Sequence, residues 1–174
     1  KLRNSDLVMY DRATESWWQQ VTGEAIIGSQ TGARLKMLPV RVVSFDEFKT
    51  ENSEGKVLMP ELASRPYGNN PYDGYDGRSA PYPFFTGNMP EGINPMARVV
   101  AVRTASTTFA ITLDLLREKR KLTQAGVTLT WRAGQTSAID TRAIADGRDV
   151  GTVSAATINS QGQATPIPYD VTFA

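Results

Sequence analysis

The chain has 174 residues, and its 40% hydrophobic and 21% charged content is ordinary for a globular domain large enough to bury a core. It contains no histidine and no cysteine, which excludes Ser/His/Asp and Cys/His catalysis, Cys/His zinc sites and a disulfide framework. Nineteen basic and 18 acidic residues give a net charge of +1, so no strong field favours nucleic acid, and no apolar run is long enough for a membrane span.

Short strands separated by turns are predicted for the first part of the chain, at 7–11, 17–21 and 25–28. Two further strand-like runs, 35–38 and 40–43, flank Pro39, and we expect them at a sheet edge or a bulge because proline has no backbone N–H to donate. The β-branched residues and the regular turns favour antiparallel pairing.

A capping box predicts a short helix after Ser44. Glu47 follows this serine at the spacing in which each side chain bonds to the other's backbone N–H. We expect the helix to end near residue 51, with Phe45 and Phe48 on its buried side.

Residues 60–97 follow a strand-like run at 56–59 and differ from the rest of the chain in composition. They contain most of the prolines and four of the six tyrosines. A loop this long is usually functional or disordered, and its aromatic content favours an ordered excursion on the surface of this protein or of a partner. We interpret its aromatic residues and Trp18 as an interface made of Tyr67, Tyr72, Tyr75, Phe84, Phe85 and Trp18. Trp17 and Trp18 point to opposite faces of a strand, so one of them in the core and the other covered by a loop is the alternative account for this pair.

The same loop offers oxygen ligands for a hard cation such as calcium, namely Asn70, Asp73 and Asp76. The regular alternation and the distal glutamate of an EF-hand are absent. Asn and Asp side chains that bond to their own backbone in turns explain the pattern as well, so turn chemistry and a cation site are both open.

The second half of the chain predicts further strands at 98–102, 107–113, 127–131, 151–157 and 169–174. A short helix is expected over 113–120, with basic residues at its C-terminal end and Gly126 closing the region. We therefore predict one mainly β domain over 1–174, an antiparallel sandwich or partly open barrel with two short helices and one long Pro/Gly/Tyr-rich loop, at 60–97.

Several segments resemble an uncharacterised bacterial and archaeal family known as domain of unknown function 3179. The most specific segments are 2–12, 14–20 and 22–26, and weaker ones are 66–72, 134–140 and 147–151. The resemblance implies an exported or membrane-anchored location and a Cys-x-x-Cys-type motif upstream of Lys1, where this chain has no residues. It also leads us to expect that the chain is a segment of a longer protein.

We predict a non-catalytic, extracytoplasmic interaction module without a cofactor, which acts through protein partners. A peripheral role in a membrane-bound respiratory or photosynthetic complex fits this description. One alternative is a redox or metal-handling protein whose cysteine site lies upstream of Lys1. The other is a calcium- or carbohydrate-binding module that uses residues 67–78.

Overall fold

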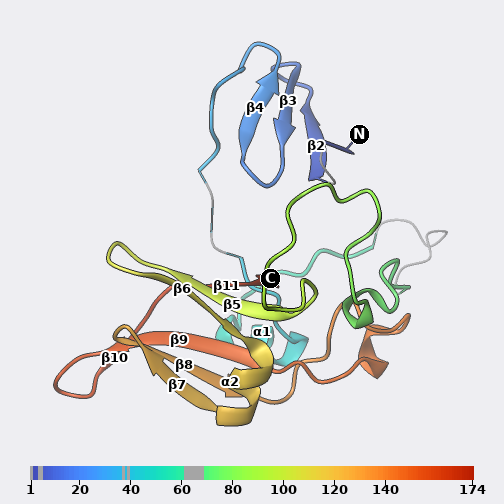
Figure 1. The fold of residues 1–174 in the computed structure, drawn as a ribbon. Helices are drawn as coiled ribbons and strands as arrows, with labels where there is room; N and C mark the ends of the chain where they lie inside the picture. The colour runs from blue at the N-terminus through green and yellow to red at the C-terminus, as the bar shows by residue number, and fades with distance from the viewer. Residues whose placement is uncertain (1, 4–5, 37, 39, 61–68) are drawn as a thin grey trace.

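Residues 2–3, 6–36, 38, 40–60 and 69–174, which the computed structural model describes, form three antiparallel sheets and two short α-helices. Two of the sheets pack face to face as a sandwich, and the third stands above them at the N-terminal end (Figure 1). The prediction of a mainly β sandwich with two helices is therefore confirmed. No helix in these described residues is long and apolar enough to cross a bilayer.

The N-terminal sheet is a meander of four strands in chain order. The strands are β1 (Leu2–Arg3), β2 (Asp6–Asp11), β3 (Ser16–Gln19) and β4 (Glu24–Ile27). They confirm the three strands predicted here, although β3 ends two residues early because the chain turns at Gly23, whose φ is +64°. That residues 1–174 form a single domain stays a prediction.

The strands predicted at 35–38, 40–43 and 56–59 are wrong for the residues that the structure describes. Residues 37 and 39 lie outside the description, and the others form no strand. Val40 is 77% exposed, and Val42 and Leu58 are also exposed. Apolar alternation alone does not make a strand, because the backbone also needs a neighbour with which to form hydrogen bonds.

Helix α1 (Phe45–Glu51) begins as predicted. The Ser44 hydroxyl accepts a hydrogen bond of 3.2 Å from the Glu47 backbone N–H. Phe45 is 60% exposed, so its predicted burial is wrong, while Phe48 is half-buried and lies against Gly55, in the turn after the helix. Phe48 is therefore the apolar residue that packs α1 against the turn that follows it.

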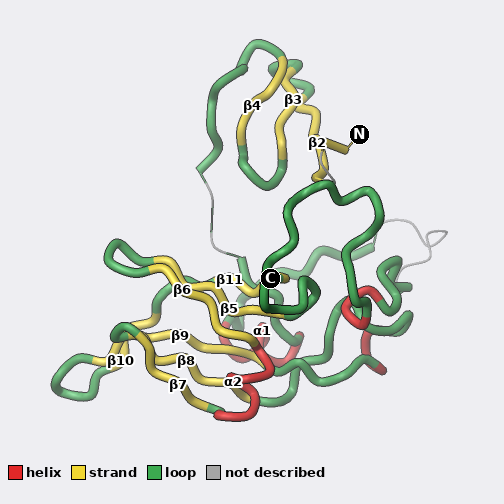
Figure 2. Tube along the Cα trace, in the orientation of Figure 1, coloured by secondary structure: helices red, strands yellow, loops and turns green. Residues whose placement is uncertain are grey.

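The sandwich consists of one three-stranded sheet, in the order β11-β5-β6, and one four-stranded sheet, in the order β10-β9-β8-β7. In chain order the elements are β5 (Arg98–Arg103), β6 (Thr108–Thr112), α2 (Leu113–Lys119), β7 (Lys121–Gln124), β8 (Val127–Arg132), β9 (Thr152–Ile158), β10 (Ala164–Pro166) and β11 (Asp170–Phe173). Two 3-10 turns, η1 (Tyr75–Gly77) and η2 (Ile144–Asp146), lie in the loops. Figure 2 shows how much of the chain is loop.

Strand β7 is missing from the prediction. Helix α2 ends at Lys119, and Arg120 then adopts a φ of +62°, which reverses the chain. Ala125 and Gly126 form the two-residue turn between β7 and β8, both with positive φ. Gly126 is thus a hairpin residue and does not close the helix.

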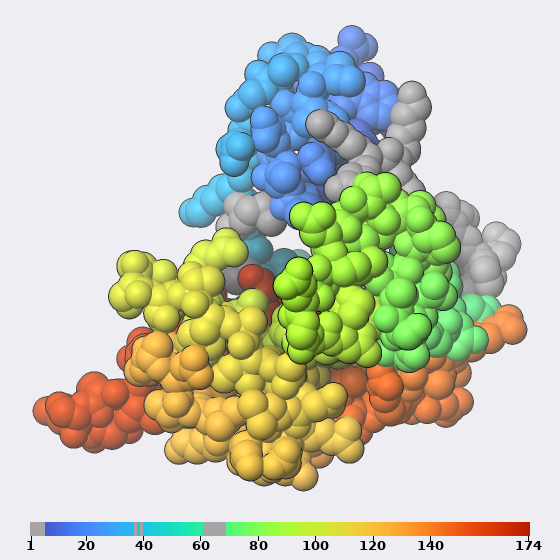
Figure 3. Space-filling model, viewed as in Figure 1, coloured from blue at the N-terminus to red at the C-terminus, as the bar shows by residue number. Residues whose placement is uncertain are grey.

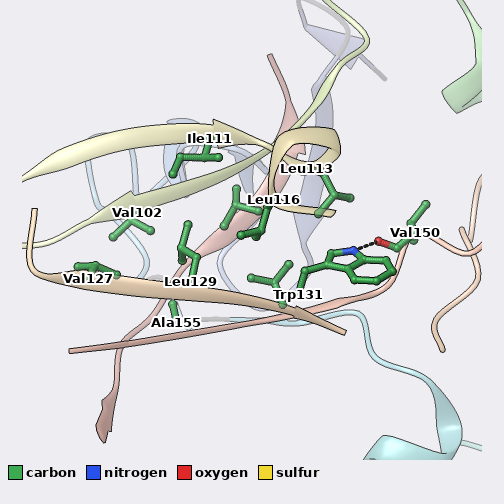
Figure 4. Close-up of a cluster of buried hydrophobic side chains, with 11 residues drawn as sticks. Val102, Ile111, Leu113, Leu116, Val127, Leu129, Trp131, Val150 and Ala155 are labelled. Atoms are coloured by element: carbon green, nitrogen blue, oxygen red, sulfur yellow. Dashed lines mark hydrogen bonds between the residues drawn. The ribbon is translucent and has the colours of Figure 1, made fainter. Parts of the chain in front are cut away.

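The core lies between the two sheets and under α2 (Figure 4). Its buried side chains are Val100, Val102, Ile111, Leu113, Leu116, Val127, Leu129, Trp131, Val150, Val153 and Ala155. The indole N–H of Trp131 donates a 2.8 Å hydrogen bond to the Val150 carbonyl oxygen, so the largest core side chain has its polar atom satisfied.

Substituting Gly151 tests how tightly this indole is held. Gly151 has a φ of +69°, and a Cβ there would overlap the Trp131 ring, which cannot move because it is buried and hydrogen-bonded. Gly151→Ala is expected to lower the free energy of unfolding by about 3 kcal/mol, the left-handed strain plus the overpacking. Urea denaturation measures the loss.

Gly126→Ala is the matched control, because its φ is +78° and nothing lies near its Cβ position. It is expected to lose only the backbone strain, about 1 kcal/mol. Equal losses in the two variants would mean that the indole is not fixed.

Candidate functional site

A buried carboxylate joins three separate parts of the chain. The Asp76 side chain, on η1, has no accessible surface. Its Oδ2 lies 2.9 Å from Arg98 Nη2, on β5, and accepts a 2.6 Å hydrogen bond from the Ser137 hydroxyl. Its Oδ1 lies 2.8 Å from Arg148 Nη2. The cluster therefore ties η1 to β5 and to the loop between β8 and β9.

The two arginines bind Asp76 differently. Arg98 Nη2 donates to both Asp76 Oδ2 and the Ser137 hydroxyl. Arg148 Nη2 directs its hydrogen bond at the Asp76 main-chain carbonyl, at 2.9 Å, so its contact with Oδ1 is an ion pair without hydrogen-bond geometry. Arg148 also has a half-exposed side chain, whereas Arg98 is largely covered.

These contacts set the charge of the buried group. Burial by itself raises the pKa of the Asp76 carboxyl group, but the hydrogen bonds from Ser137 and Arg98 and the charge of Arg148 outweigh it. The pKa therefore lies below its ordinary value of 3.8, and Asp76 is ionised at neutral pH.

Backbone hydrogen bonds fix the loop around Asp76. Asn70 N–H donates to the Arg142 carbonyl at 2.9 Å, and Asp76 N–H donates to the Ile139 carbonyl at 3.3 Å. Gly74, with a φ of +69°, provides the left-handed residue that starts η1. The segment 69–78 is therefore docked along its neighbour rather than loose.

Aromatic rings gather directly beside this buried cluster. Tyr75 precedes Asp76 and lies 4.8 Å from Tyr82 and 5.7 Å from Phe173, measured between ring centroids. Tyr72 meets Tyr75 edge to face at 6.2 Å, and Phe84 stacks on Tyr82 at 5.4 Å. The Arg98 guanidinium lies 5.7 Å from the Phe173 ring, so the same arginine supports the carboxylate and the rings.

The rings border two neighbouring hollows. The first, of about 370 Å³, is lined by Tyr72, Tyr75, Pro81, Tyr82, Phe84, Phe85 and Ile139. The second, of about 220 Å³, is lined by Tyr75, Pro81, Phe85, Asn88, Met89, Pro90, Pro95, Met96, Phe173 and Ala174. They share Tyr75, Pro81 and Phe85, and we call the pair the aromatic groove. Figure 3 shows that the segment 69–97, in green, covers a broad area of the face drawn there.

Residues 1–170 match the family described as "Protein of unknown function (DUF3179)". The chain belongs to this family. The resemblance seen in the sequence is thereby confirmed over nearly the whole chain. Comparison with curated proteins and with solved structures finds no match.

The structure of this DUF3179 protein brings together four of the residues predicted to form an interface: Tyr72, Tyr75, Phe84 and Phe85. Trp18 is half-buried on β3, in the N-terminal sheet, and Tyr67 lies outside the described residues. Their role in an interface stays a prediction.

The sequence prediction did not include Tyr82, Phe173 or the buried ion cluster. Tyr82 stands in a Pro-Tyr-Pro run within the predicted loop, which was a usable signal. Phe173 lies at the end of the chain and reaches the groove only because β11 pairs with β5. Asp76 was considered only as a calcium ligand, since nothing local marks Arg98 or Arg148 as its partners.

The DUF3179 chain uses its candidate cation ligands in other ways. Asn70 Nδ2 donates to the Thr141 carbonyl, and its Oδ1 accepts from the Tyr72 N–H, which is the turn chemistry considered for this residue. Asp76 is held by two arginines, and Asp73 is exposed. The described part of the chain holds no group of three acidic side chains placed to bind a metal ion.

Asp76→Asn tests the buried ion cluster. The variant leaves two guanidinium groups without their anion, and we expect it to lower the free energy of unfolding at pH 7 by about 3 kcal/mol. This loss is at the low end of what breaking a buried ion pair costs, because Arg148 is half exposed to water. Asp73→Asn removes an exposed carboxylate three residues away and is expected to change stability by less than about 0.5 kcal/mol.

The contribution of Asp76 to the free energy of unfolding should decrease as the pH is lowered. The pKa of Asp76 is lower in the folded protein than its ordinary value of 3.8. The ionised carboxylate therefore contributes its full stability above pH 3.8, and this contribution is lost as the pH falls through the pKa of the folded state. The stability difference between wild type and Asp76→Asn, measured by urea denaturation at several pH values, should therefore shrink in acid. A difference that stays constant down to pH 2 would contradict this assignment.

Proposed function

We propose that this protein is a non-catalytic interaction module that presents the aromatic groove to a partner protein. The observation that carries the proposal is the position of the groove, an open aromatic surface built directly on a buried ion cluster. Exposed aromatic rings held in one arrangement are typical of the residues that contribute most to protein–protein affinity.

The rigidity of the groove supports this proposal. The Tyr75 ring packs against Tyr82 and Phe173, and the backbone at Tyr72 is held by its N–H bond to Asn70. A surface ordered before binding loses little conformational entropy when a partner arrives, so more of the contact energy appears as affinity. Tyr72 and Phe84 are nevertheless 52% and 56% exposed, which leaves area for a partner to cover.

The chemistry of the cluster also favours a non-catalytic role. A general acid or base works best with a pKa near the operating pH. The pKa of Asp76 is lowered instead, and its carboxylate is enclosed by Arg98, Arg148 and Ser137. These contacts suit an anchor that stays charged.

We include an extracytoplasmic location and membership of a membrane-bound assembly, such as a respiratory or photosynthetic complex, in this proposal. Their support is what the family resemblance implies, together with the aromatic groove as a surface through which the module joins the assembly.

The test is native migration of tagged full-length protein, extracted in mild detergent from its source and analysed by native gel and mass spectrometry. Wild type is expected to migrate with a larger assembly. The double variant Tyr72→Ala/Phe84→Ala is expected to run alone, because it removes exposed aromatic area without touching the ion cluster.

The matched control is Tyr10→Ala/Phe45→Ala, which removes a tyrosine and a phenylalanine that are 48% and 60% exposed in other parts of the fold. This control should migrate as wild type does. The proposal fails if wild type runs alone, or if both double variants lose the assembly equally while remaining folded by circular dichroism.

A further inference from the structure

The two hollows of the aromatic groove lie next to each other and share one ridge. The ridge consists of Tyr75, Pro81 and Phe85, which line both hollows. A chain segment that crosses this ridge and fills both hollows places one apolar group on each side of it, as an extended backbone does. This arrangement differs from a single pocket that encloses one side chain.

The polyproline II helix meets that requirement. It is extended, with about 3.1 Å of rise per residue, and successive pairs of its residues dock into successive hollows of aromatic-lined grooves. Its backbone carbonyls have no internal hydrogen bonds and need donors from the binding surface. Tyr72, Tyr82 and Asn88 line the groove, and their side chains carry hydroxyl and amide groups of the kind that can act as such donors.

The lining of the first hollow favours proline over sugar as the stacked group. Its polar side-chain atoms are the hydroxyls of Tyr72, Tyr75 and Tyr82, and its other described lining residues are apolar. A sugar carries a hydroxyl on most of its carbons and needs many polar partners when its surface is covered. A proline ring has no polar side-chain atom to satisfy.

The positive charge of Arg78, next to the groove, indicates which charge the bound segment carries. The Arg78 guanidinium lies 4.7 Å from the centroid of the Tyr82 ring, and its Nε donates to the Ala80 carbonyl. Within the described residues, no carboxylate lies at ion-pair distance from Arg78. Among the described residues Arg78 therefore has no acidic partner, and it lies over Tyr82, which lines the first hollow.

We propose that the occupant of the aromatic groove is a proline-rich, extended segment of the partner protein, with an acidic residue beside its prolines that pairs with Arg78. This inference rests on the proposed function and specifies the partner's chemistry. Tyr72, Tyr75, Tyr82 and Phe84 stack on the prolines, and Arg78 selects the acidic neighbour.

The first experiment is selection from a displayed library of short random peptides on the wild-type protein. Peptides that also bind Tyr72→Ala/Phe84→Ala are removed by counter-selection on that variant. We expect the surviving peptides to be enriched in proline and in Asp or Glu relative to the starting library. Survivors without proline enrichment, or no survivors that distinguish the two proteins, would overturn the proposal.

The second experiment measures fluorescence polarisation with one selected, labelled peptide. Replacing its prolines by glycine should weaken binding on the order of tenfold or more, because the extended conformation is then no longer preformed. Arg78→Met keeps an apolar stem over Tyr82 and should weaken binding about threefold, as expected for a partly exposed ion pair. Arg103→Met, an exposed arginine on β5, is the control and should leave binding unchanged.

The outcomes separate this inference from the proposed function. One outcome is that Tyr72→Ala/Phe84→Ala abolishes the native assembly while the glycine-substituted peptide binds as well as the proline-rich one. The groove would then bind a partner protein, and the inference that this partner is proline-rich would be wrong. Displacement of the labelled peptide by an oligosaccharide such as cellohexaose at comparable concentration would overturn it as well. If wild type forms no assembly at all, the proposed function fails first.

Discussion

The ionised Asp76 carboxylate is the constraint on which the part of the structure beside the aromatic groove depends. A charge without access to water is tolerated only when cations and hydrogen-bond donors surround it, and Asp76 has two guanidinium groups and one hydroxyl. Because those groups come from β5 and from the loop before β9, satisfying one charge fixes three segments relative to one another. This electrostatic constraint acts on the loop at 69–78 together with the backbone hydrogen bonds that dock it along residues 139–142.

The hydrophobic core and the groove have separate physical origins. The core between the two sheets is closed by Trp131 and Leu116 and gives the sandwich its stability. The groove lies outside it and is held by contacts between its rings, beside the polar contacts of Asp76, with Arg98 on β5 as the link between the core sheet and the groove. This division explains how rings such as Tyr72 and Phe84 stay exposed in a stable protein: they are not needed to close the core.

The wrong and missing strand predictions show that local sequence patterns do not predict which segments pair in a sheet. The run at 40–43 has the composition of a strand, but its backbone has no sheet neighbour in the described structure, and Val40 and Val42 remain exposed. Strand β7 was missed for the opposite reason, because only a residue with positive φ at Arg120 separates it from α2. A strand is defined by pairing between distant residues, and composition does not report that pairing.

The sequence by itself determined the mainly β class, the capped helix at Ser44, the strands at 98–102 and 127–131, and the aromatic character of the loop at 60–97. All of these depend on residues close together in the chain, where periodicity, capping and turn chemistry act. Only the tertiary structure decided that Asp76 would meet Arg98 and Arg148, and that Phe173 would join Tyr75. Those contacts arise from strand pairing and loop docking across long sequence separations, and the free energy of the whole fold selects them.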